Sequence, residues 1–463
     1  MSTVARAPNS APILDAHEPL AARMAQAASG TTLETLPAEV ITKTKVCLFD
    51  LIGCAFESRD LPWSKQSVAL ATQVPNGATI IGYPGSTTLF DAAFANAVMG
   101  HGLVREDMHS GSISHLGIAV LPTLLALSQY RGVRGADFIA AAAVGYEVGG
   151  QIGRAIMDAE VARIHRPTGV TGPVAAAAAG ARLLKLDVEQ TTTAIALGAN
   201  STAGFNQWAH TGGSEMWFQA GFAARNGVTA ARLAENGAFA SPSALDGEAG
   251  LFAAFRKRSA AAKVEMFAGL PEMLAVYHKP VPACNFAQTA CQAALGVAKE
   301  TRIKPDAIAS IAIRVPRAGA LYPGCDYSGP FAHVLQAKMS IQYNVAAALL
   351  AGSVSERNFT LLNDAALHRL IGHTTLDVDD EMTRAYPGKQ GGEVTVTEAS
   401  GATHCIRLED VVNATGADVR SRFRAAAADV LGKQRAEEVE QAIDKLEACE
   451  DVGKIVGMLA ADK

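Results

Sequence analysis

The feature that most constrains this chain is a long succession of alanine- and glycine-rich segments with helical periodicity, running from residue 17 to about residue 267. Alanine has the highest intrinsic helix propensity, so this pattern predicts helix after helix. Within Ala136–Ile156, Gly145, Gly149 and Gly153 recur every four residues and therefore share one helix face. A dinucleotide-binding loop would need its glycines between a strand and a helix. We expect these glycines to allow close packing of another backbone.

The pattern changes between about Glu272 and Cys405. Alternating apolar residues predict a strand over 307–315, ended by Pro316. Two further strands, over 393–398 and 403–408, flank Ala399–Gly401 and predict a hairpin. Helical patterns are predicted elsewhere over 172–186, 188–197, 220–236, 288–301, 340–351, 416–431 and 436–448.

Runs of helices, then strands, then helices favour a mainly α protein with a smaller α+β domain. We predict a flexible tail over residues 1–16, a helical domain over 17–271 and 409–463, and an α+β lid domain over 272–408.

The amino-acid composition excludes several classes of protein. The chain has 463 residues, is 49% hydrophobic and carries a formal charge of −5, which excludes a disordered chain and the basic balance of a nucleic-acid-binding protein. Its seven cysteines form no CxxC pair, so neither a disulfide framework nor a zinc ribbon is expected. No signal peptide or membrane-spanning stretch is evident, and we expect a cytoplasmic protein without nucleic-acid or membrane partners.

The most polar segment is His101–His115, with the sequence HGLVREDMHSGSISH. Three histidines, one arginine and two acids precede an apolar run over 116–127. A metal site, a surface loop and an acid/base loop lining a cleft all fit this composition. Because the histidines lack HxxxH or HxxEH spacing, we favour the acid/base loop and expect no metal.

Four other segments concentrate polar groups in helical surroundings. In Arg163–Gly172, Arg166 stands before Pro–Thr–Gly at a predicted helix start, which suits a carboxylate ligand. Gly204–Arg225 gathers amides, imidazole and two tryptophans that also fit a packed core. Tyr277–Cys284 holds Lys279 beside prolines, and Lys338–Asn344 leads to Tyr343, for which core filler and a functional role are equally open.

Together these segments resemble the MmgE/PrpD family, which includes 2-methylcitrate dehydratase, cis-aconitate decarboxylase and iminodisuccinate epimerase. The resemblance covers about residues 17 to 455 and rests on FDLIGCAF, FDAAFANAVMGHGL, HLGIAVLPTLLAL, GFAARNGVTAARLA, KPVPAC and AKMSIQYNVAAALLAG. It implies a large helical domain and an α+β lid with the active site between them. It also implies a homodimer that needs no cofactor.

The resemblance also implies roles for individual residues. His115 corresponds to the family's active-site His, Lys279 to the Lys of its K-x-Y/V-P-x-C motif, and Tyr343 to the Tyr of its S-x-x-Y motif. Asp107 lies in the family's acidic loop. Three positions depart from the family pattern. Arg166 and Gln288 occupy positions where a His is usual, and Met216 occupies a position where a Lys is usual. His165 directly precedes Arg166.

Removing a proton next to a carboxylate requires a cation on that carboxylate and a base at the proton. We expect His115 to be the base, with Lys279, Tyr343 and His165 as the other catalytic residues. The expected substrate-binding residues are Arg105, Asp107, His109, Arg166, His101 and Gln219. His101, His165 and His210 are alternatives to Tyr343 as the acid.

These residues favour a lyase, specifically a hydro-lyase that dehydrates a small hydroxy-carboxylic acid. An isomerase or epimerase and a decarboxylase are alternatives, because the same groups serve all three reactions. A non-catalytic binding protein on the same fold is a further alternative. A locally positive cleft in an acidic protein would attract a small carboxylate.

Overall fold

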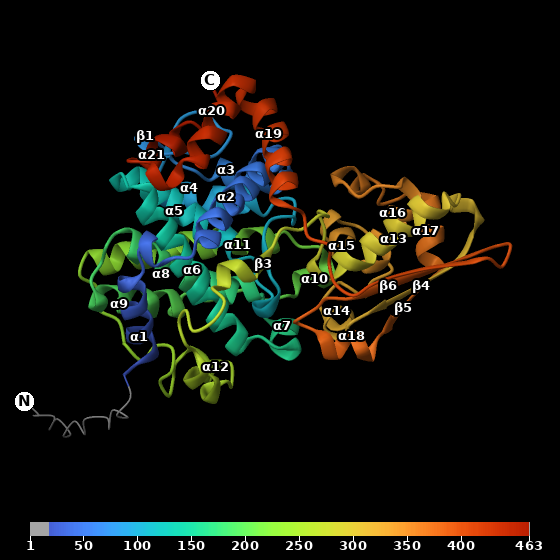
Figure 1. The fold of residues 1–463 in the computed structure, drawn as a ribbon, viewed down its shortest axis with the longest axis horizontal. Helices are drawn as coiled ribbons and strands as arrows, with labels where there is room; N and C mark the ends of the chain where they lie inside the picture. Colours follow the sequence, from blue (N-terminus) through green and yellow to red (C-terminus); the bar gives the residue numbers. More distant parts are fainter. Residues whose placement is uncertain (1–17, 463) are drawn as a thin grey trace, which may run out of the picture.

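The structure is a computed structural model that describes residues 18–462. It has two lobes (Figure 1). We define the larger lobe as residues 18–278 and 409–462, the smaller lobe as residues 284–408, and residues 279–283 as the connecting segment. The protein is mainly α with a small sheet confined largely to the smaller lobe, which confirms the predicted fold class. The predicted tail over residues 1–16 lies outside the described residues.

The larger lobe consists almost entirely of helices. Its first half holds α1 (Leu20–Gly30), α2 (Ala38–Ser58), α3 (Pro62–Ala69), α4 (Leu89–Gly100), α5 (Gly117–Arg131) and α6 (Gly135–Ile156), with the short strand β1 (Gln73–Ala78). Next come α7 (Ala159–Ile164), α8 (Pro167–Leu183), α9 (Val188–Asn200), α10 (Trp208–Thr211), α11 (Glu215–Glu235) and α12 (Leu251–Ala254). The chain returns to this lobe with α19 (Gly416–Leu431), α20 (Lys433–Asp444) and α21 (Val452–Gly457), drawn in red in Figure 1.

Helix α8 lies at the centre of this lobe and packs against α5, α6, α9 and α11. It begins at Pro167, five residues before the predicted start, because proline fits the first turn of a helix, where its missing N–H is not needed. Small residues permit the tight packing. A Cβ added to Gly149 would lie 2.8 Å from the Cβ of Ala175 on α8, so the predicted packing role of the α6 glycines is confirmed.

The smaller lobe combines a four-stranded sheet with helices. Its strands are β4 (Ile308–Val315), β5 (Thr374–Val378), β6 (Gly392–Glu398) and β7 (Thr403–Leu408), in the order β5-β4-β6-β7. Strands β6 and β7 pair antiparallel, Gly392 opposite Leu408, which confirms the predicted hairpin. The helices are α13 (Gln288–Thr301), α14 (Arg317–Leu321), α15 (Val334–Met339), α16 (Ile341–Ala351), α17 (Ala365–Gly372) and α18 (Asp380–Ala385).

Residues 272–278, which we predicted within the α+β part, pack on the larger lobe. Strand β3 (Val276–Tyr277) pairs antiparallel with β2 (Met108–His109), and Glu272 binds the side chains of His109 and Arg154. The chain therefore crosses to the smaller lobe only after His278. These pairings fix the 101–115 loop against the segment that leads into the smaller lobe.

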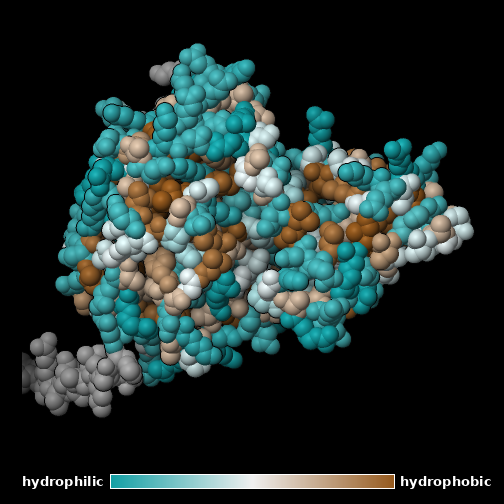
Figure 2. Space-filling model, viewed as in Figure 1, coloured by the Kyte–Doolittle hydropathy of each residue, from teal (hydrophilic) through white to brown (hydrophobic). Residues whose placement is uncertain are grey.

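Figure 2 shows polar side chains over most of the periphery and apolar patches on both lobes. None of the helices within residues 18–462 combines the length and the apolar character that a membrane span requires. All seven cysteines are free thiols. Five of them are buried, whereas Cys405 is exposed and Cys449 is partly exposed.

Candidate active site

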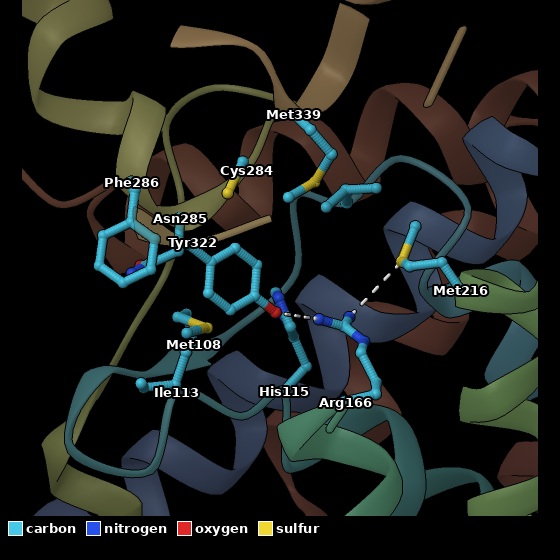
Figure 3. Close-up of a pocket in the computed structure, with 11 residues that line it drawn as sticks. Met108, Ile113, His115, Arg166, Met216, Cys284, Asn285, Phe286, Tyr322 and Met339 are labelled. Atoms are coloured by element: carbon cyan, nitrogen blue, oxygen red, sulfur yellow. Dashed lines mark hydrogen bonds between the residues drawn. The ribbon is translucent and has the colours of Figure 1, made fainter. Parts of the chain in front are cut away.

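A small pocket lies where the two lobes meet (Figure 3). The larger lobe contributes the loop between α4 and α5, the start of α8 and Met216 of α11. The smaller lobe contributes Cys284–Phe286, Tyr322 and Met339. The lining is mainly apolar, with few polar side chains: His115, Arg166, Cys284, Asn285 and Tyr322. A concave, mainly apolar pocket with a few convergent polar groups is the usual form of a small-molecule site.

The loop that supplies His115 is strained. Val104 and Ile113 both line the pocket, and both have left-handed backbone conformations, with φ of 57° and 53°. β-branched residues rarely adopt this conformation, and such strain is concentrated at functional sites. The turn at Val104 is followed by side chains that point in different directions. Arg105 binds Glu57, Glu106 binds two imidazoles, and the carboxyl group of Asp107 binds Tyr146.

Glu106 holds His101 and His115 together. Its Oε1 atom lies 2.8 Å from Nδ1 of His115 and hydrogen bonds Nδ1 of His101, and all three side chains are buried. Nδ1 of His115 also lies 3.0 Å from the carbonyl oxygen of Asp107. Both neighbours of this nitrogen are acceptors, so Nδ1 carries the proton and Nε2 keeps its lone pair. This tautomer makes His115 a proton acceptor.

Electrostatics supports the neutral form of His115. Burial, opposed by the Glu106 charge and reinforced by the Lys279 charge, lowers the pKa of His115 to about 3. Burial likewise lowers the pKa of His101. Burial by itself would raise the pKa of Glu106, but the two imidazoles beside it hold that pKa well below its usual value. The cluster is therefore an ionised carboxylate with two neutral imidazoles.

Arg166 is a buried cation with no acidic partner. It precedes Pro167, which favours an extended backbone, and its side chain projects from the start of α8 into the pocket. Its Nη1 donates to the Tyr322 hydroxyl at 3.2 Å and its Nη2 to Nε2 of His101 at 3.0 Å. Its Nε has no hydrogen-bond partner, and within residues 18–462 no carboxylate lies at ion-pair distance from it. A bound anion would satisfy this guanidinium.

Lys279 lies beside the cluster and forms no ion pair with any residue of the described range 18–462. Its fully buried ammonium donates to the carbonyl oxygen of Ala283 at 3.0 Å. Burial, partly offset by the charge of Glu106, lowers the pKa of Lys279 to about 8. Gln288 fixes the same segment, because its amide donates to the carbonyl oxygens of Val281, Ala283 and Cys284.

Three residues that we predicted for substrate binding point away from the pocket. The guanidinium of Arg105 binds Glu57. The carboxyl group of Asp107 accepts from the Tyr146 hydroxyl at 2.7 Å, and only its carbonyl oxygen contacts His115. His109 accepts from the Ser112 N–H through Nδ1 and donates from Nε2 to Glu272 at 2.6 Å, so both of its nitrogens are occupied.

The structure also separates three other predicted residues from His115. Tyr343 is fully buried among aromatic rings and donates to the carbonyl oxygen of Asn358 at 2.8 Å. His165 packs against Phe205 and Phe255, and Gln219 donates to the Phe205 carbonyl oxygen. The predicted residues that do come together are His101, His115, Arg166 and Lys279. The two tryptophans of the 204–225 segment are core residues.

Sequence reasoning missed Glu106, Tyr322 and Cys284. Glu106 lies between two residues that we did select, and the loop's sequence gives no periodicity that would show which of three adjacent side chains faces the histidines. Tyr322 comes from a short turn that no motif marks. Cys284 belongs to the KPVPAC stretch, but cysteines are so often inert core residues that its position alone carried no signal.

His101, Glu106 and His115 also form the one cluster within residues 18–462 whose composition suits a metal ion. Each imidazole Nδ1 is already directed at the Glu106 carboxylate. A metal ion bound there would have to replace both contacts, so this donor set is better matched to proton transfer than to metal binding.

Comparison with known proteins identifies the family of this chain. The model of the MmgE/PrpD N-terminal domain matches residues 22–263, and that of the MmgE/PrpD C-terminal domain matches residues 281–448. The chain is 27% identical to a cis-aconitate decarboxylase-like protein of Aspergillus oryzae, over 92% of this chain and 94% of the relative. It is 26% identical to human cis-aconitate decarboxylase, over 94% and 93%, and 31% identical to that of Aspergillus terreus, over 45% and 44%. The two matched domains span most of the sequence, and the chain therefore belongs to the MmgE/PrpD family.

Proposed function

We propose that this protein is a lyase that acts on a small carboxylate, and specifically a hydro-lyase. The observation that carries the proposal is the pairing of Arg166, a buried guanidinium without an acidic partner, with the free Nε2 of His115 in one pocket. The first group suits the substrate carboxylate, and the second suits the proton next to it. The family relatives, which are named for a lyase reaction on a carboxylate, support the class of activity.

In this reaction Nε2 of His115 removes a proton from the carbon next to the bound carboxylate. Negative charge then develops on the carboxylate oxygens, where Arg166 donates hydrogen bonds that strengthen as the charge grows. Glu106 keeps the imidazole in the correct tautomer and stabilises the imidazolium that forms, as a carboxylate does for histidine in many hydrolases. The hydroxyl group on the neighbouring carbon leaves as water once it has received a proton.

The tautomer of His115 favours dehydration over direct decarboxylation. Dehydration begins with proton removal, which a lone pair on Nε2 can perform. Loss of CO₂ needs no base but requires a proton donor for the carbanion, and Nε2 carries no proton in the free protein.

Decarboxylation is the second candidate. It is favoured by the names of the relatives and by the apolar lining around Val104, Met108 and Met339, since an apolar wall disfavours a carboxylate more than it disfavours CO₂.

The pocket favours a small acid with few carboxylates. Arg166 is the one cationic side chain among the described residues that line it, and Met216 lies where the family resemblance places a lysine. Each further carboxylate would need its own compensating charge in this buried setting. We therefore propose a hydroxy-monocarboxylate or hydroxy-dicarboxylate as the substrate.

Proton NMR in D₂O tests this function. The protein is mixed with malate, citramalate, citrate and cis-aconitate in separate samples, and CO₂ release is measured in parallel. A new vinyl signal without CO₂ supports the hydro-lyase, whereas CO₂ release from cis-aconitate establishes the decarboxylase instead. Deuterium incorporation without net loss of the acid indicates an isomerase. Binding without any of these changes would contradict a catalytic function.

Variants of the His115 cluster test the assigned roles on whichever acid is turned over. We expect His115→Ala to lower kcat by about 10²–10⁴-fold, the usual contribution of a general base. Glu106→Gln should lower kcat less and leave the KM of the acid nearly unchanged, because it acts through the imidazole. His373→Ala, an exposed histidine in the smaller lobe, is the matched control and should retain wild-type kcat. Wild-type turnover in folded His115→Ala protein would refute the assignment.

A further inference from the structure

Elimination needs a proton donor for the departing hydroxyl group, and His115 in its free tautomer cannot supply that proton. The residue that we predicted for this role, Tyr343, donates its hydroxyl proton to Asn358. We propose that Cys284 is the second proton-transfer residue of the site, acting from the smaller lobe while His115 acts from the larger lobe. This inference rests on the proposed function, and it assigns the group that protonates the leaving oxygen.

The position of Cys284 fits this role. Its thiol lines the pocket, and in Figure 3 its sulfur points toward the interior of the group of labelled side chains, which also holds His115 and Arg166. Arg166 is 5% exposed, lines the same pocket and has an unpartnered Nε. The pocket therefore contains, together with the Cys284 thiol, a buried guanidinium whose hydrogen-bonding capacity is not filled, and this observation is independent of the cysteine itself.

The backbone around Cys284 is held rigidly. Its N–H donates to the carbonyl oxygen of Lys338 at 2.9 Å, and its own carbonyl oxygen accepts from Ala287 N–H and from the Gln288 amide. These contacts join the connecting segment to α13 and α15. A fixed backbone keeps the thiol within a narrow range of positions, as proton transfer over about 3 Å requires.

The surroundings of the sulfur stabilise a thiolate. The Sγ of Cys325 lies 3.4 Å away and can donate its S–H, and the Phe286 N–H at the start of the following helical turn also points to it. Burial opposes ionisation of Cys284, but these donors and the charges of Lys279 and Arg166 lower its pKa below the usual value. The pKa of Cys325 is raised well above its usual value, mainly by burial, so Cys284 is the more acidic thiol of the pair and the one that can give up its proton to a leaving oxygen. The other titratable side chains that interact with the Cys284 charge are Tyr277, Tyr322 and Tyr386.

The proton balance of the step closes within the site. His115 Nε2 takes the proton from carbon, the electron pair of that C–H bond forms the new C=C bond, and the C–O bond breaks. The leaving oxygen takes the Cys284 proton and departs as water. Transfer of the proton from the His115 imidazolium to the Cys284 thiolate restores both groups, with no oxidant or reductant required.

The decisive experiment separates carbon deprotonation from elimination. On an acid that the wild type dehydrates, Cys284→Ala should lower the rate of water loss at least about 100-fold, in the range of general acid catalysis. The same variant should still exchange the substrate proton with D₂O within about threefold of the wild type, because His115 is intact. Cys291→Ala, another buried cysteine of the smaller lobe that does not line the pocket, is the matched control and should keep both rates.

Two results on that acid would overturn the inference. One is wild-type dehydration by Cys284→Ala. The other is an equal loss of exchange and elimination, which would indicate a structural role for the thiol. Cys284→Ser, which keeps the size but is a weaker acid, should fall between the wild type and Cys284→Ala in its elimination rate.

A second measurement does not depend on any substrate and so distinguishes this inference from the proposed function. The ultraviolet absorbance of thiolate is titrated in the wild type and in Cys284→Ala, and the difference reports Cys284. We expect its midpoint below the ordinary value of about 8.5, and we expect Cys325→Ala to move it upward. A midpoint at or above about 8.5 would overturn the assignment even if the protein proves to be a hydro-lyase. Failure of every acid in the panel, with a low midpoint, would instead refute the hydro-lyase function alone.

Discussion

At the scale of single residues, the site depends on which way three neighbouring side chains point. Arg105, Glu106 and Asp107 follow one another, yet their side chains contact Glu57, the two imidazoles and Tyr146 respectively. The left-handed conformation of Val104 immediately before them is part of this arrangement. Sequence inspection could identify the loop as functional, but the side-chain directions depend on backbone angles that only the packed structure fixes.

Asp107 gives a pH-dependent prediction at this scale. Burial raises the pKa of Asp107 from 3.8 to about 6, against the hydrogen bond from Tyr146 that lowers it. The folded state therefore favours the protonated acid, and its stabilisation is present below about pH 4 and is lost as the pH rises through about 6. We expect the wild type to lose about 3 kcal/mol of unfolding free energy through this group, most of it between about pH 4 and pH 7.

Denaturant unfolding across this pH range measures the effect. Asp107→Asn keeps an oxygen that accepts from Tyr146 but cannot ionise, so its stability should change less over the same range. Because the carboxyl group faces away from the pocket, this variant should also retain turnover within a few-fold. If the unfolding free energies of the two proteins change with pH in parallel, Asp107 is already ionised at low pH in the folded state, and the prediction is wrong.

At the scale of elements, close packing of α6 on its neighbours supports the loop that carries His115. A Cβ at Gly149 would lie 2.6 Å from Cδ2 of Leu116, the residue directly after His115, and 2.8 Å from the Cβ of Ala175. The glycine spacing was readable from the sequence because helical periodicity is local. The identity of the partner helix was not, since α8 follows α6 only after the intervening α7 and its packing is a tertiary contact.

Gly149→Ala tests this packing. We expect it to lower the unfolding free energy by about 1–3 kcal/mol through overpacking, despite the better helix propensity of alanine. A displacement of Leu116 would also move His115, so kcat should fall. Gly30→Ala at the end of α1 has nothing within 4 Å of the new Cβ and is the control, expected to be neutral or slightly stabilising. If Gly149→Ala leaves the unfolding free energy unchanged, the contacts among α5, α6 and α8 can rearrange to accommodate the extra methyl group, and the prediction is wrong.

At the scale of the whole molecule, a buried lysine joins the two lobes behind the pocket. The Lys338 ammonium, fully buried in α15, donates to the carbonyl oxygen of Leu103 in the larger lobe at 3.2 Å and to that of Pro282 in the connecting segment at 3.1 Å. It also pairs with Glu356 at 2.7 Å. This single cation therefore links the His101–His115 loop to the connecting segment, which begins at Lys279 and leads into Cys284.

We expect Lys338→Met to destabilise the protein by about 3 kcal/mol, because it leaves two carbonyl groups and a carboxylate without their partner. Since the two walls of the pocket lose their common anchor, the KM of the acid should rise along with a fall in kcat. Lys299→Met on the exposed face of α13 is the matched control. Thermal unfolding and steady-state kinetics measure both effects, and unchanged kinetics in a folded Lys338→Met protein would exclude a role for this link in shaping the pocket.

The sequence by itself predicted the helical lobe and the β6–β7 hairpin, and its motifs marked His115, Arg166 and Lys279 as candidate site residues. These properties follow from local periodicity, turn residues and motifs, which act over a few residues of chain. The tertiary structure decided that the side chain of Glu106 rather than that of Asp107 contacts His115, that Tyr322 contacts Arg166 while Tyr343 binds Asn358, and that Cys284 lines the pocket. Those choices depend on contacts between distant segments, such as Arg166 and Tyr322, which lie 156 residues apart, and hydrogen bonding to a buried partner cannot be read from the composition of either segment alone.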